Sequence, residues 1–400
     1  MKKYIDSIPV GNKESFWKVI PKNWEIKTLN SVCDFLDSQR IPIKDIDRAK
    51  ISGIYPYYGA SGIIDYVNKY IFDDDLILLA EDGANIINRS TPIAFLVNGK
   101  IWVNNHAHVL KVRPNTDRYY LCAYLESLKY DKYNTGTAQP KLNRETCEKI
   151  PVLVPPLPEQ RKIADILNTW DKAIEKQTQL IEKLELRKKG LMQQLLTGKK
   201  RLPGGSGEWK KIAIKDFAID ISLKNTHNEN WEVLSCTKYD GLVPSLQYFG
   251  RQVFSKDITQ YKIVPQYCFA YATNHIEEGS IGYQSTYRNA LISPMYTVFK
   301  TDSNVIDDIF LYKLLKSHRA IYLYNVMMEG SIDRRGGLRW DNFSTIKFLL
   351  PDIKEQSAIA DILVSCDNEI LLAKQKLNKF RQQKKGLMQV LLTGKKRVNI

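Results

Sequence analysis

Two closely spaced histidines are the first candidates for chemistry, because imidazole serves as a general base and as a metal ligand near neutral pH. His106 and His108 are the only close pair among the five histidines of the chain. On a strand, both side chains would face the same side. No carboxylate or cysteine set stands beside them in the sequence, so the pair does not predict a metal site. We expect these residues either to contact a nucleic-acid base or to pack in the ordinary way.

Motifs for nucleotide and methyl-group chemistry are missing from the sequence. The phosphate loop G-x-x-x-x-G-K-[ST] is absent, because Gly198-Lys199 has no glycine five residues upstream. There is no G-x-G-x-x-G segment, and no Asn-Pro-Pro-Tyr or Asp-Pro-Pro-Tyr tetrapeptide of amino-methyltransferases. Pro351-Asp352 resembles the start of a nuclease motif, but a predicted helix follows it. The sequence therefore predicts no catalytic residue, no metal and no resident cofactor, and it favours a binding protein.

Polar, aromatic and glycine residues gather in segments that we expect to be loops. Arg with guanine, and Asn or Gln with adenine, are the common side-chain pairs in direct base recognition. The alternative for each residue is that it only forms a turn. The candidate DNA-binding residues are Tyr58, Ser61, Asn104, Asn105, His106, Thr137, Gln139 and Lys141 in the first half of the chain, and Gln247, Arg251, Asn274, His275, Tyr283, Arg288, Arg334, Arg335 and Arg339 in the second.

A gapless internal repeat indicates the elements that must position these loops. Residues 159–201 and 355–397 align at a constant offset of 196, and 24 of the 43 aligned positions are identical. In both copies apolar residues recur at alternating steps of four and three, which is typical of a coiled-coil seam. Gly190 and Gly386 inside the pattern indicate either a bend or a close helix crossing. The seam residues are Ile163, Leu167, Trp170, Ile174, Ile181 and Leu184 in the first copy, and Ile359, Leu363, Ile370, Leu377 and Phe380 in the second.

The two predicted helices should pack on each other in antiparallel directions. A parallel pair in register would set Lys188 against Lys384, which is repulsive. Antiparallel pairing instead places Lys188 near Asp367 and Lys384 near Asp171. It would also make the molecule pseudo-twofold. The alternative is that each helix packs only on its own domain and that the repeat reflects ancestry alone.

Short apolar or alternating runs bounded by turn residues precede each helix and predict a mixed or antiparallel sheet. The predicted fold class is therefore α+β, with two globular domains separated by two long helices that pack as an antiparallel coiled coil. The expected strands include 76–80, 93–97, 109–112, 267–272 and 296–299, and the expected short helices are 119–128 and 307–315. The expected domains are 1–158, the central helix 159–200, the second globular domain 201–354 and the C-terminal helix 355–400.

The charge of the chain is concentrated in the repeat. Of the formal net charge of +15 on 400 residues, each repeat copy carries +5, which leaves only +5 for the globular domains. Overall charge therefore does not establish that the domains bind DNA. The six cysteines contain no C-x-x-C pair, and no apolar run approaches the ~20 residues of a membrane span. We expect a cytoplasmic protein with reduced cysteines and no membrane contact.

Along essentially its whole length, the sequence resembles the specificity subunit of type I restriction–modification enzymes. The first globular domain carries stretches that look like target-recognition domains of that family. The second domain lacks the Gly-Ala-x-Gly and Glu-Asp-Gly stretches, so its recognition domain is of a divergent type. The resemblance rests on Pro155-Pro156-Leu157-Pro158-Glu159-Gln160 with Ile163, Ala164 and Leu167, on Glu355-Gln356 with Ile359, Ala360 and Leu363, on the two Lys-Lys-Gly-Leu-Met-Gln helix ends, and on the stretches 58–64, 79–84 and 293–298.

The resemblance implies a division of labour. Each globular domain would recognise one half of a bipartite, asymmetric target in double-stranded DNA. The helices would set the spacing and form the docking surface for two methyltransferase (modification) subunits. Those partners would hold S-adenosylmethionine and methylate adenine, and restriction subunits with ATP-driven, Mg-dependent translocation and nuclease activity would join them. The chain itself would be non-catalytic and would bind none of these cofactors.

Two functions of other classes are alternatives. One is a stand-alone, sequence-specific DNA-binding or architectural protein without enzymatic partners, which the exposed faces of the long helices argue against. The other is a cryptic nuclease or methyltransferase, which the missing motifs oppose.

Overall fold

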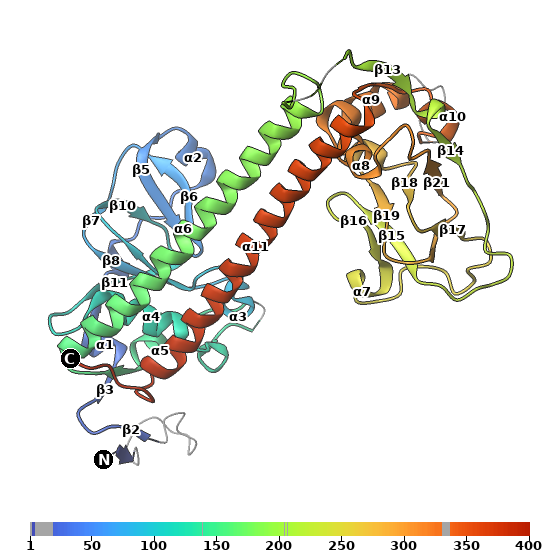
Figure 1. The fold of residues 1–400 in the computed structure, drawn as a ribbon. Coiled ribbons are helices and arrows are strands. Elements are labelled where there is room, and N and C mark those ends of the chain that lie inside the picture. Colours follow the sequence, from blue (N-terminus) through green and yellow to red (C-terminus); the bar gives the residue numbers. More distant parts are fainter. Residues whose placement is uncertain (1, 5–18, 138, 204, 206, 330–336) are drawn as a thin grey trace. The chain divides into compact units, whose positions relative to one another are not determined.

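The computed structural model describes residues 2–4, 19–137, 139–203, 205, 207–329 and 337–400. The chain divides into two compact units, one formed by Met1–Thr178 with Gln375–Ile400 and the other by Gln179–Lys374. The division falls inside both long helices, α6 (Leu157–Leu195) and α11 (Ile353–Leu391), which Figure 1 shows as continuous. Each unit therefore contains one globular part and a segment of each long helix. Among the residues described, no helix is long and apolar enough to cross a membrane.

The globular part of the first unit contains two four-stranded sheets. Its elements are β1 (Lys2–Tyr4), β2 (Val19–Pro21), β3 (Glu25–Thr28), α1 (Leu29–Val32), β4 (Cys33–Phe35), η1 (Asp37–Gln39), α2 (Asp45–Ala49), β5 (Ser52–Gly59), β6 (Gly62–Val67), β7 (Phe72–Asp73), β8 (Leu76–Ala80), α3 (Asn85–Asn88), β9 (Ala94–Val97), β10 (Lys100–Val103), β11 (Ala107–Val112), α4 (Arg118–Ser127), η2 (Asp131–Tyr133), α5 (Arg144–Glu148) and β12 (Pro151–Val154). The sheet orders are β6-β5-β10-β7 and β4-β11-β8-β9, and β12 pairs with β3. Within these two sheets, β5 and β10 are parallel and the other neighbours are antiparallel.

The globular part of the second unit has the same topology. Its elements are β13 (Lys210–Ala213), η3 (Ile214–Asp216), β14 (Ala218–Asp220), β15 (Val233–Thr237), β16 (Gly241–Pro244), α7 (Ser245–Phe249), β17 (Lys262–Pro265), β18 (Cys268–Ala272), η4 (Ile276–Glu278), β19 (Ile281–Gln284), β20 (Asn289–Ile292), β21 (Tyr296–Thr301), α8 (Asp308–Leu315), α9 (His318–Glu329), α10 (Trp340–Phe343) and β22 (Lys347–Leu350). The orders are β16-β15-β20-β17 and β14-β21-β18-β19, with β13 paired to β22. The parallel neighbours are again the equivalent pair, β15 and β20. The divergent second sequence thus folds on the same scaffold.

The largest described hydrophobic cluster of each unit includes the start of one long helix and the end of the other. In the first unit, Ile163 and Leu167 of α6 are buried in one cluster with Leu391 and Leu392, together with the apolar face of α4. In the second unit, the equivalent residues of α11 lie in one cluster with Leu195 of α6. The alternative that each helix packs only on its own domain is therefore wrong.

The long helices are antiparallel in both units, as the seam lysines predict. Lys384 forms an ion pair with Asp171 in the first unit, and Lys188 forms one with Asp367 in the second. Most seam residues are buried, because each helix covers the apolar stripe of the other. The buried members are Ile163, Leu167, Ile181, Leu184, Ile359, Leu363, Ile370 and Leu377, while Trp170, Ile174 and Phe380 are half-buried.

Two adjacent residues anchor the first turn of α6 to the globular part of the first unit. The Gln160 side chain accepts a hydrogen bond from the Asp117 backbone N–H at 2.8 Å. The carboxylate of Glu159 is fully buried and accepts two hydrogen bonds from Arg397, at 2.5 and 2.7 Å. It also accepts one from the Trp24 indole at 3.0 Å. The C-terminal tail is thereby tied to the start of α6.

The second unit repeats this arrangement with the repeat copies exchanged. Gln356 accepts from the Asp307 backbone N–H at 2.8 Å. Glu355 accepts from Arg201 at 2.7 and 2.6 Å and from the Trp209 indole at 3.3 Å. The two residues of each Glu-Gln pair therefore have different contacts. The Gln binds the globular part of its unit, and the Glu binds the arginine that follows the end of the other long helix.

Candidate nucleic-acid interface

The loop between β10 and β11 presents two exposed candidate residues in the first unit. Its first residue, Asn104, is buried, and its side-chain oxygen accepts a hydrogen bond from the His106 backbone N–H at 2.8 Å. The Asn104 backbone N–H donates to the carbonyl of Tyr58 at 3.0 Å. These bonds fix the turn so that Asn105 and His106 face solvent. Asn104 therefore shapes the loop, while the next two side chains are available to a ligand.

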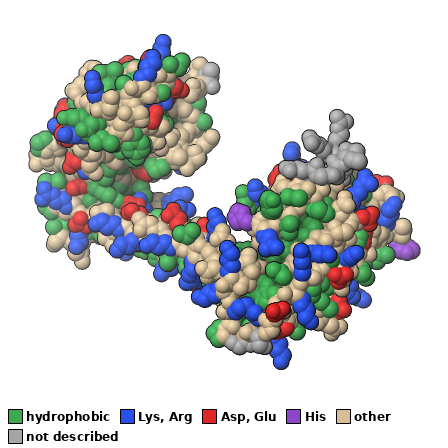
Figure 2. All heavy atoms as spheres, turned by 90° about the horizontal axis from the view of Figure 1, so that it is seen from above, with side chains coloured by type: hydrophobic (Ala, Val, Ile, Leu, Met, Phe, Trp, Pro, Cys, Tyr) green, Lys and Arg blue, Asp and Glu red, His purple; other side chains and the backbone are tan. Residues whose placement is uncertain are grey.

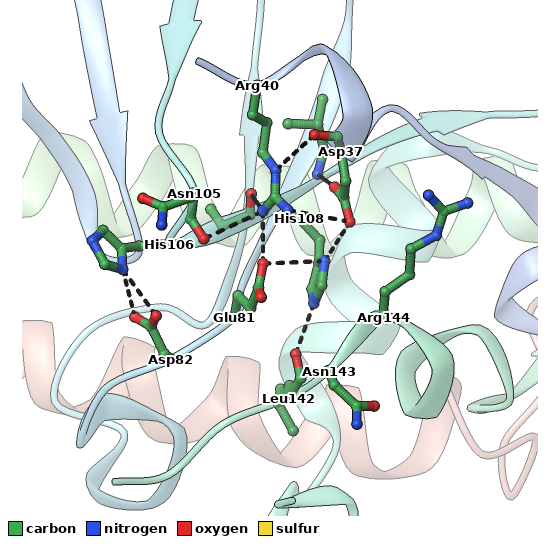
Figure 3. Close-up of polar contacts among 12 residues, drawn as sticks. Asp37, Arg40, Glu81, Asp82, Asn105, His106, His108, Leu142, Asn143 and Arg144 are labelled. Atoms are coloured by element: carbon green, nitrogen blue, oxygen red, sulfur yellow. Dashed lines mark hydrogen bonds and ion pairs between the residues drawn. The ribbon is translucent and has the colours of Figure 1, made fainter. Parts of the chain in front are cut away.

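Beside this loop lies a cluster of four charged side chains, Asp37, Arg40, Glu81 and His108, shown in Figure 3. Arg40 donates to the Glu81 carboxylate at 2.7 Å and to the backbone carbonyl of Ala107 at 2.8 Å. His108 is buried, and its Nδ1 lies 2.7 Å from the Asp37 carboxylate. Its Nε2 lies 2.8 Å from the backbone carbonyl of Leu142. The cluster thus connects η1, the end of β8, the start of β11 and the chain beyond η2.

The imidazole of His108 is positively charged in this setting. Both of its nitrogens face acceptors, a carboxylate and a carbonyl, so both must donate, as only the imidazolium does. Burial by itself would lower the pKa of His108, but hydrogen bonds with Asp37 and Cys147 and the charge of Asp37 raise it to about 10. Burial would raise the pKa of Asp37, yet the hydrogen bond and charge of His108 lower it. The two groups form a buried ion pair near neutral pH.

Residues 140–142 are held against the same cluster. The backbone N–H of Leu142 donates to the Glu81 carbonyl at 2.7 Å, and that of Gly83 donates to Pro140 at 3.1 Å. The ammonium of Lys141 lies 3.4 Å from the Glu81 carboxylate. The structure therefore brings the Asn104–His106 loop and Lys141 together at Glu81, whose backbone N–H donates to the His106 carbonyl at 2.9 Å, while Tyr58 joins the loop through Asn104.

The two histidines do not share a side, contrary to the strand-based expectation. β11 begins at Ala107, so His106 belongs to the preceding loop and the two-residue period of a strand does not apply to it. The expected lack of carboxylates is also wrong, because Asp82 lies 2.9 Å from His106 and Asp37 contacts His108. In Figure 3 the His106 ring points to Asp82 and away from His108. These partners are 24 and 71 residues away in the sequence, so the sequence alone did not indicate them.

The remaining candidates of the first unit are placed at its surface or near it. Tyr58 is half-buried, with its ring centroid 6.1 Å from that of Phe95. Ser61, Thr137, Gln139 and Lys141 are exposed. Ser61 lies at the tip between β5 and β6, where Gly62 has a φ of 126° that side chains rarely adopt.

In the second unit, the turn between β19 and β20 is fixed by a buried amide. The side chain of Gln284 accepts hydrogen bonds from the backbone N–H groups of Thr286 and Tyr287, at 2.7 and 3.0 Å. The carbonyl of Arg288 accepts from the Gln266 backbone N–H at 3.0 Å, and the Arg288 side chain is exposed. A cavity of about 120 Å³ lies beside this turn, lined by Leu234, Leu242, Pro244 and residues 283–287.

The other candidates of the second unit come from separate loops. Asn274 lies beside the segment 337–339. The backbone N–H of Leu338 donates to the Thr273 carbonyl at 2.9 Å. A Cβ added to Gly337 would lie 2.4 Å from the Asn274 side-chain oxygen. Tyr283 is half-buried and donates to Asp308 at 3.0 Å. Gln247, Arg251, His275 and Arg339 are exposed. Arg334 and Arg335 lie outside the described residues.

The sequence did not single out the residues that hold these loops in place. Asp37 and Arg40 lie about 70 residues from their partners in β11, and no local pattern links them. Gln284 looks like any polar strand residue until its burial is known. Glu81 is the exception, since it belongs to a stretch that carries the family resemblance.

Cations are more prominent on the long helices than on the globular parts. Figure 2 shows Lys and Arg side chains along the helices, whereas on the globular parts they are mixed with acidic, polar and apolar side chains. Exposed cations of the helices include Arg161, Lys162, Lys172, Lys183 and Lys379. The globular loops therefore offer specific polar contacts on a surface of mixed charge.

Comparisons with known proteins agree with one another. Residues 21–186 match the family model of the type I restriction modification DNA specificity domain. The MjaVIII type I restriction enzyme specificity subunit of Methanocaldococcus jannaschii is 26% identical over 431 residues, which covers 96% of both chains. A Haemophilus influenzae protein named as a type I restriction enzyme specificity subunit is 33% identical over 160 residues, which is 39% of this chain and 40% of that protein.

The fold also has a counterpart among solved structures. The S subunit of a type I restriction–modification system from M. genitalium superposes with a TM-score of 0.59 at 14% sequence identity, covering 97% of this chain and 98% of that one. At this identity the similarity establishes the fold.

Proposed function

We propose, for a chain that belongs to the family of type I restriction–modification specificity subunits, that it selects the DNA sequence on which such an enzyme acts. Each globular part recognises one half of a bipartite target in double-stranded DNA. The observation that carries this proposal is the repeated scaffold. The two units have the same strand orders, yet their exposed loops carry different side chains. Two recognition domains that share one fold but carry different loop side chains would recognise different bases. This is what an asymmetric DNA target requires.

In the first unit, the exposed Asn105 and His106 are suited to contact base edges. Asn offers a donor and an acceptor that match adenine, and His can donate to a guanine or accept from an exocyclic amine. Lys141 and the glycine-containing tip at Ser61 are suited to phosphates. In the second unit, Arg288 and Arg251 are suited to guanine.

The chain itself acts without catalysis and holds no cofactor in this proposal. The missing nucleotide and methyltransferase motifs support this role. Burial raises the pKa of Cys33, Cys122 and Cys236 to about 12, so these cysteines are thiols near neutral pH and are poor nucleophiles. S-adenosylmethionine, ATP and Mg belong to partner subunits.

The partners we propose are two modification subunits, which methylate adenine, and restriction subunits with translocase and nuclease activity. The long helices provide the spacing between the two readers and the docking surface for the modification subunits. The complex would work in the cytoplasm.

The proposal is tested by changing the loop residues of one unit at a time. Asn105→Ala with His106→Ala, in the complex with its modification subunits, should relax or change the recognised bases in one half of the target, at a cost of about 1–3 kcal/mol per lost base contact. Arg288→Ala should do the same in the other half. Methylation-sensitive sequencing of a randomised DNA library reads out both halves. Unchanged methylation patterns in both variants would contradict the assignment of these loops.

A further inference from the structure

The two histidines of the first unit have different hydrogen-bond surroundings, although they are only two residues apart. Both ring nitrogens of His108 face acceptors. The His106 ring has one acceptor group, because its Nδ1 lies 2.9 Å from each oxygen of the Asp82 carboxylate. Within the part of the chain that the structure describes, its Nε2 has no hydrogen-bond partner, and the side chain is 49% exposed. One nitrogen of His106 is therefore occupied, and the other is open to a ligand.

The carboxylate of Asp82 is held in a fixed position relative to this ring. The backbone N–H of Glu81 donates to the His106 carbonyl at 2.9 Å. On its other side, Asp82 forms an antiparallel bridge with Lys141. The Asp82 side chain is only 24% exposed, and Figure 3 shows it facing the His106 ring. These contacts set the carboxylate where it can orient the imidazole.

A carboxylate beside Nδ1 decides which nitrogen carries the proton of a neutral imidazole. An ionised carboxylate only accepts hydrogen bonds, so the nitrogen that faces it must donate. In the neutral ring the other nitrogen then carries a lone pair. No second acceptor faces His106 among the described residues, so the arrangement that makes His108 an imidazolium is not repeated there. With its proton on Nδ1, neutral His106 offers Nε2 as an acceptor.

The charge of Asp82 is not balanced by a lysine or arginine in the described part of the chain, where its ion-pair partner is His106. The neighbouring carboxylate of Glu81, by contrast, lies beside both Arg40 and Lys141. A carboxylate without a cation repels phosphates and so weakens the attraction of a surface for DNA. What Asp82 provides in return is the orientation and the proton position of His106.

The base edges that match an acceptor follow from the pattern of the major groove. Adenine and cytosine each present an exocyclic amino group there, at N6 and N4. At the equivalent places guanine and thymine present carbonyl oxygens, whose lone pairs would face the lone pair of Nε2. An imidazole with its proton on Nδ1 therefore favours adenine or cytosine.

We propose that Asp82 is a positioning residue that makes Nε2 of His106 an acceptor, so that the first unit selects a base with an exocyclic amino group at one position of its half of the target. This inference rests on the proposed function. It decides between the donor and acceptor roles that are open to His106 there.

The proton position is measured on the full chain without DNA. Nitrogen-15 NMR of histidine-labelled protein, assigned with His106→Gln, distinguishes a protonated ring nitrogen from one with a lone pair. At about pH 8.5, above the ordinary range of imidazole protonation, His106 should carry its proton on Nδ1. Asp82→Asn should shift the proton towards Nε2, because an amide can also donate to Nδ1. A proton on Nε2 in the wild type, in a neutral or a charged ring, overturns the inference.

The consequence for recognition is measured in the complex with the modification subunits, by methylation-sensitive sequencing of a randomised DNA library at the same pH. His106→Ala identifies the contacted position as the one that loses its base preference. There the wild type should prefer adenine or cytosine by about fivefold or more. Asp82→Asn should abolish or invert this preference without lowering total methylation, because a charge that repels phosphates is gone.

Asp131→Asn is the control, because it removes an exposed carboxylate from the same unit. It should leave the proton position and the base preference unchanged. The inference alone fails if the contacted position prefers guanine or thymine, if Asp82→Asn keeps the wild-type preference, or if His106→Ala changes no position while other preferences persist. If the wild-type complex shows no base preference in either half, the proposed function fails, and the inference fails with it.

Discussion

At the scale of single residues, the first unit depends on a buried ion pair that keeps its recognition loops in place. His108 and Asp37 connect β11 to η1, and His108 also binds the carbonyl of Leu142, next to Lys141. Removing one member of such a pair leaves the other charge buried and uncompensated. The pair should therefore contribute to stability and to the shape of the loops, without touching DNA.

We predict that His108→Gln lowers the free energy of unfolding of the first unit by about 3 kcal/mol near pH 6. The pKa of His108 is raised from 6.5 to about 10 in the folded protein. The stabilisation by the imidazolium is therefore complete below about pH 6.5 and fades as the pH rises towards 10. The difference between wild type and variant should shrink between pH 6 and pH 9.5, as measured by urea unfolding.

His106→Gln is the matched control, since its ring is exposed and lies beside β11. It should change the free energy of unfolding by no more than about 0.5 kcal/mol at any of these pH values. A constant deficit for His108→Gln across the pH range would contradict the charged state assigned to this histidine.

The limits of sequence-based prediction are clearest at this scale. The exposed loops were found from their polar and glycine residues, and Asn105 and His106 are indeed at the surface. Asn104 could not be told from its neighbour, because only the turn geometry directs its side chain inward. The partners of His108 come from η1 and from beyond η2, and a spacing rule carries no information about such pairings.

At the scale of elements, the Glu-Gln pairs explain why the first and last residues of the two repeat copies are identical. The Glu that begins one copy pairs with the Arg that ends the other. Glu159 is paired with the tail residue Arg397, and Glu355 with Arg201. The seam period and the two lysines were enough to predict the helices and their direction. The sheet order was not predictable, because the strands are short and β5 pairs with β10, which follows it by more than 40 residues.

We predict that Arg397→Ala lowers the free energy of unfolding of the first unit by about 3 kcal/mol, because it leaves the fully buried Glu159 carboxylate without its cation. Hydrogen exchange should increase in the first turns of α6 and in the last turn of α11. Lys395→Ala, at an exposed position of the same tail, should leave both unchanged. Equal effects of the two substitutions would show that the tail acts by general charge and not through Glu159.

At the scale of the whole molecule, the chain consists of two units of one topology joined through two shared helices. The largest described hydrophobic cluster of each unit includes the end of a helix that begins in the other unit. The globular part of either unit should therefore be replaceable as long as both helices stay intact. This modularity is what a subunit that combines two independent recognition events requires.

The most direct test of this account is an exchange of the globular part of the first unit, residues 25–154, for that of another specificity subunit. Both long helices and the second unit are kept, and the complex with the modification subunits is assayed by methylation-sensitive sequencing. The account predicts that one half of the target changes, while the other half and the spacing between them stay the same. Changes in both halves, or an altered spacing with the original bases retained, would contradict it.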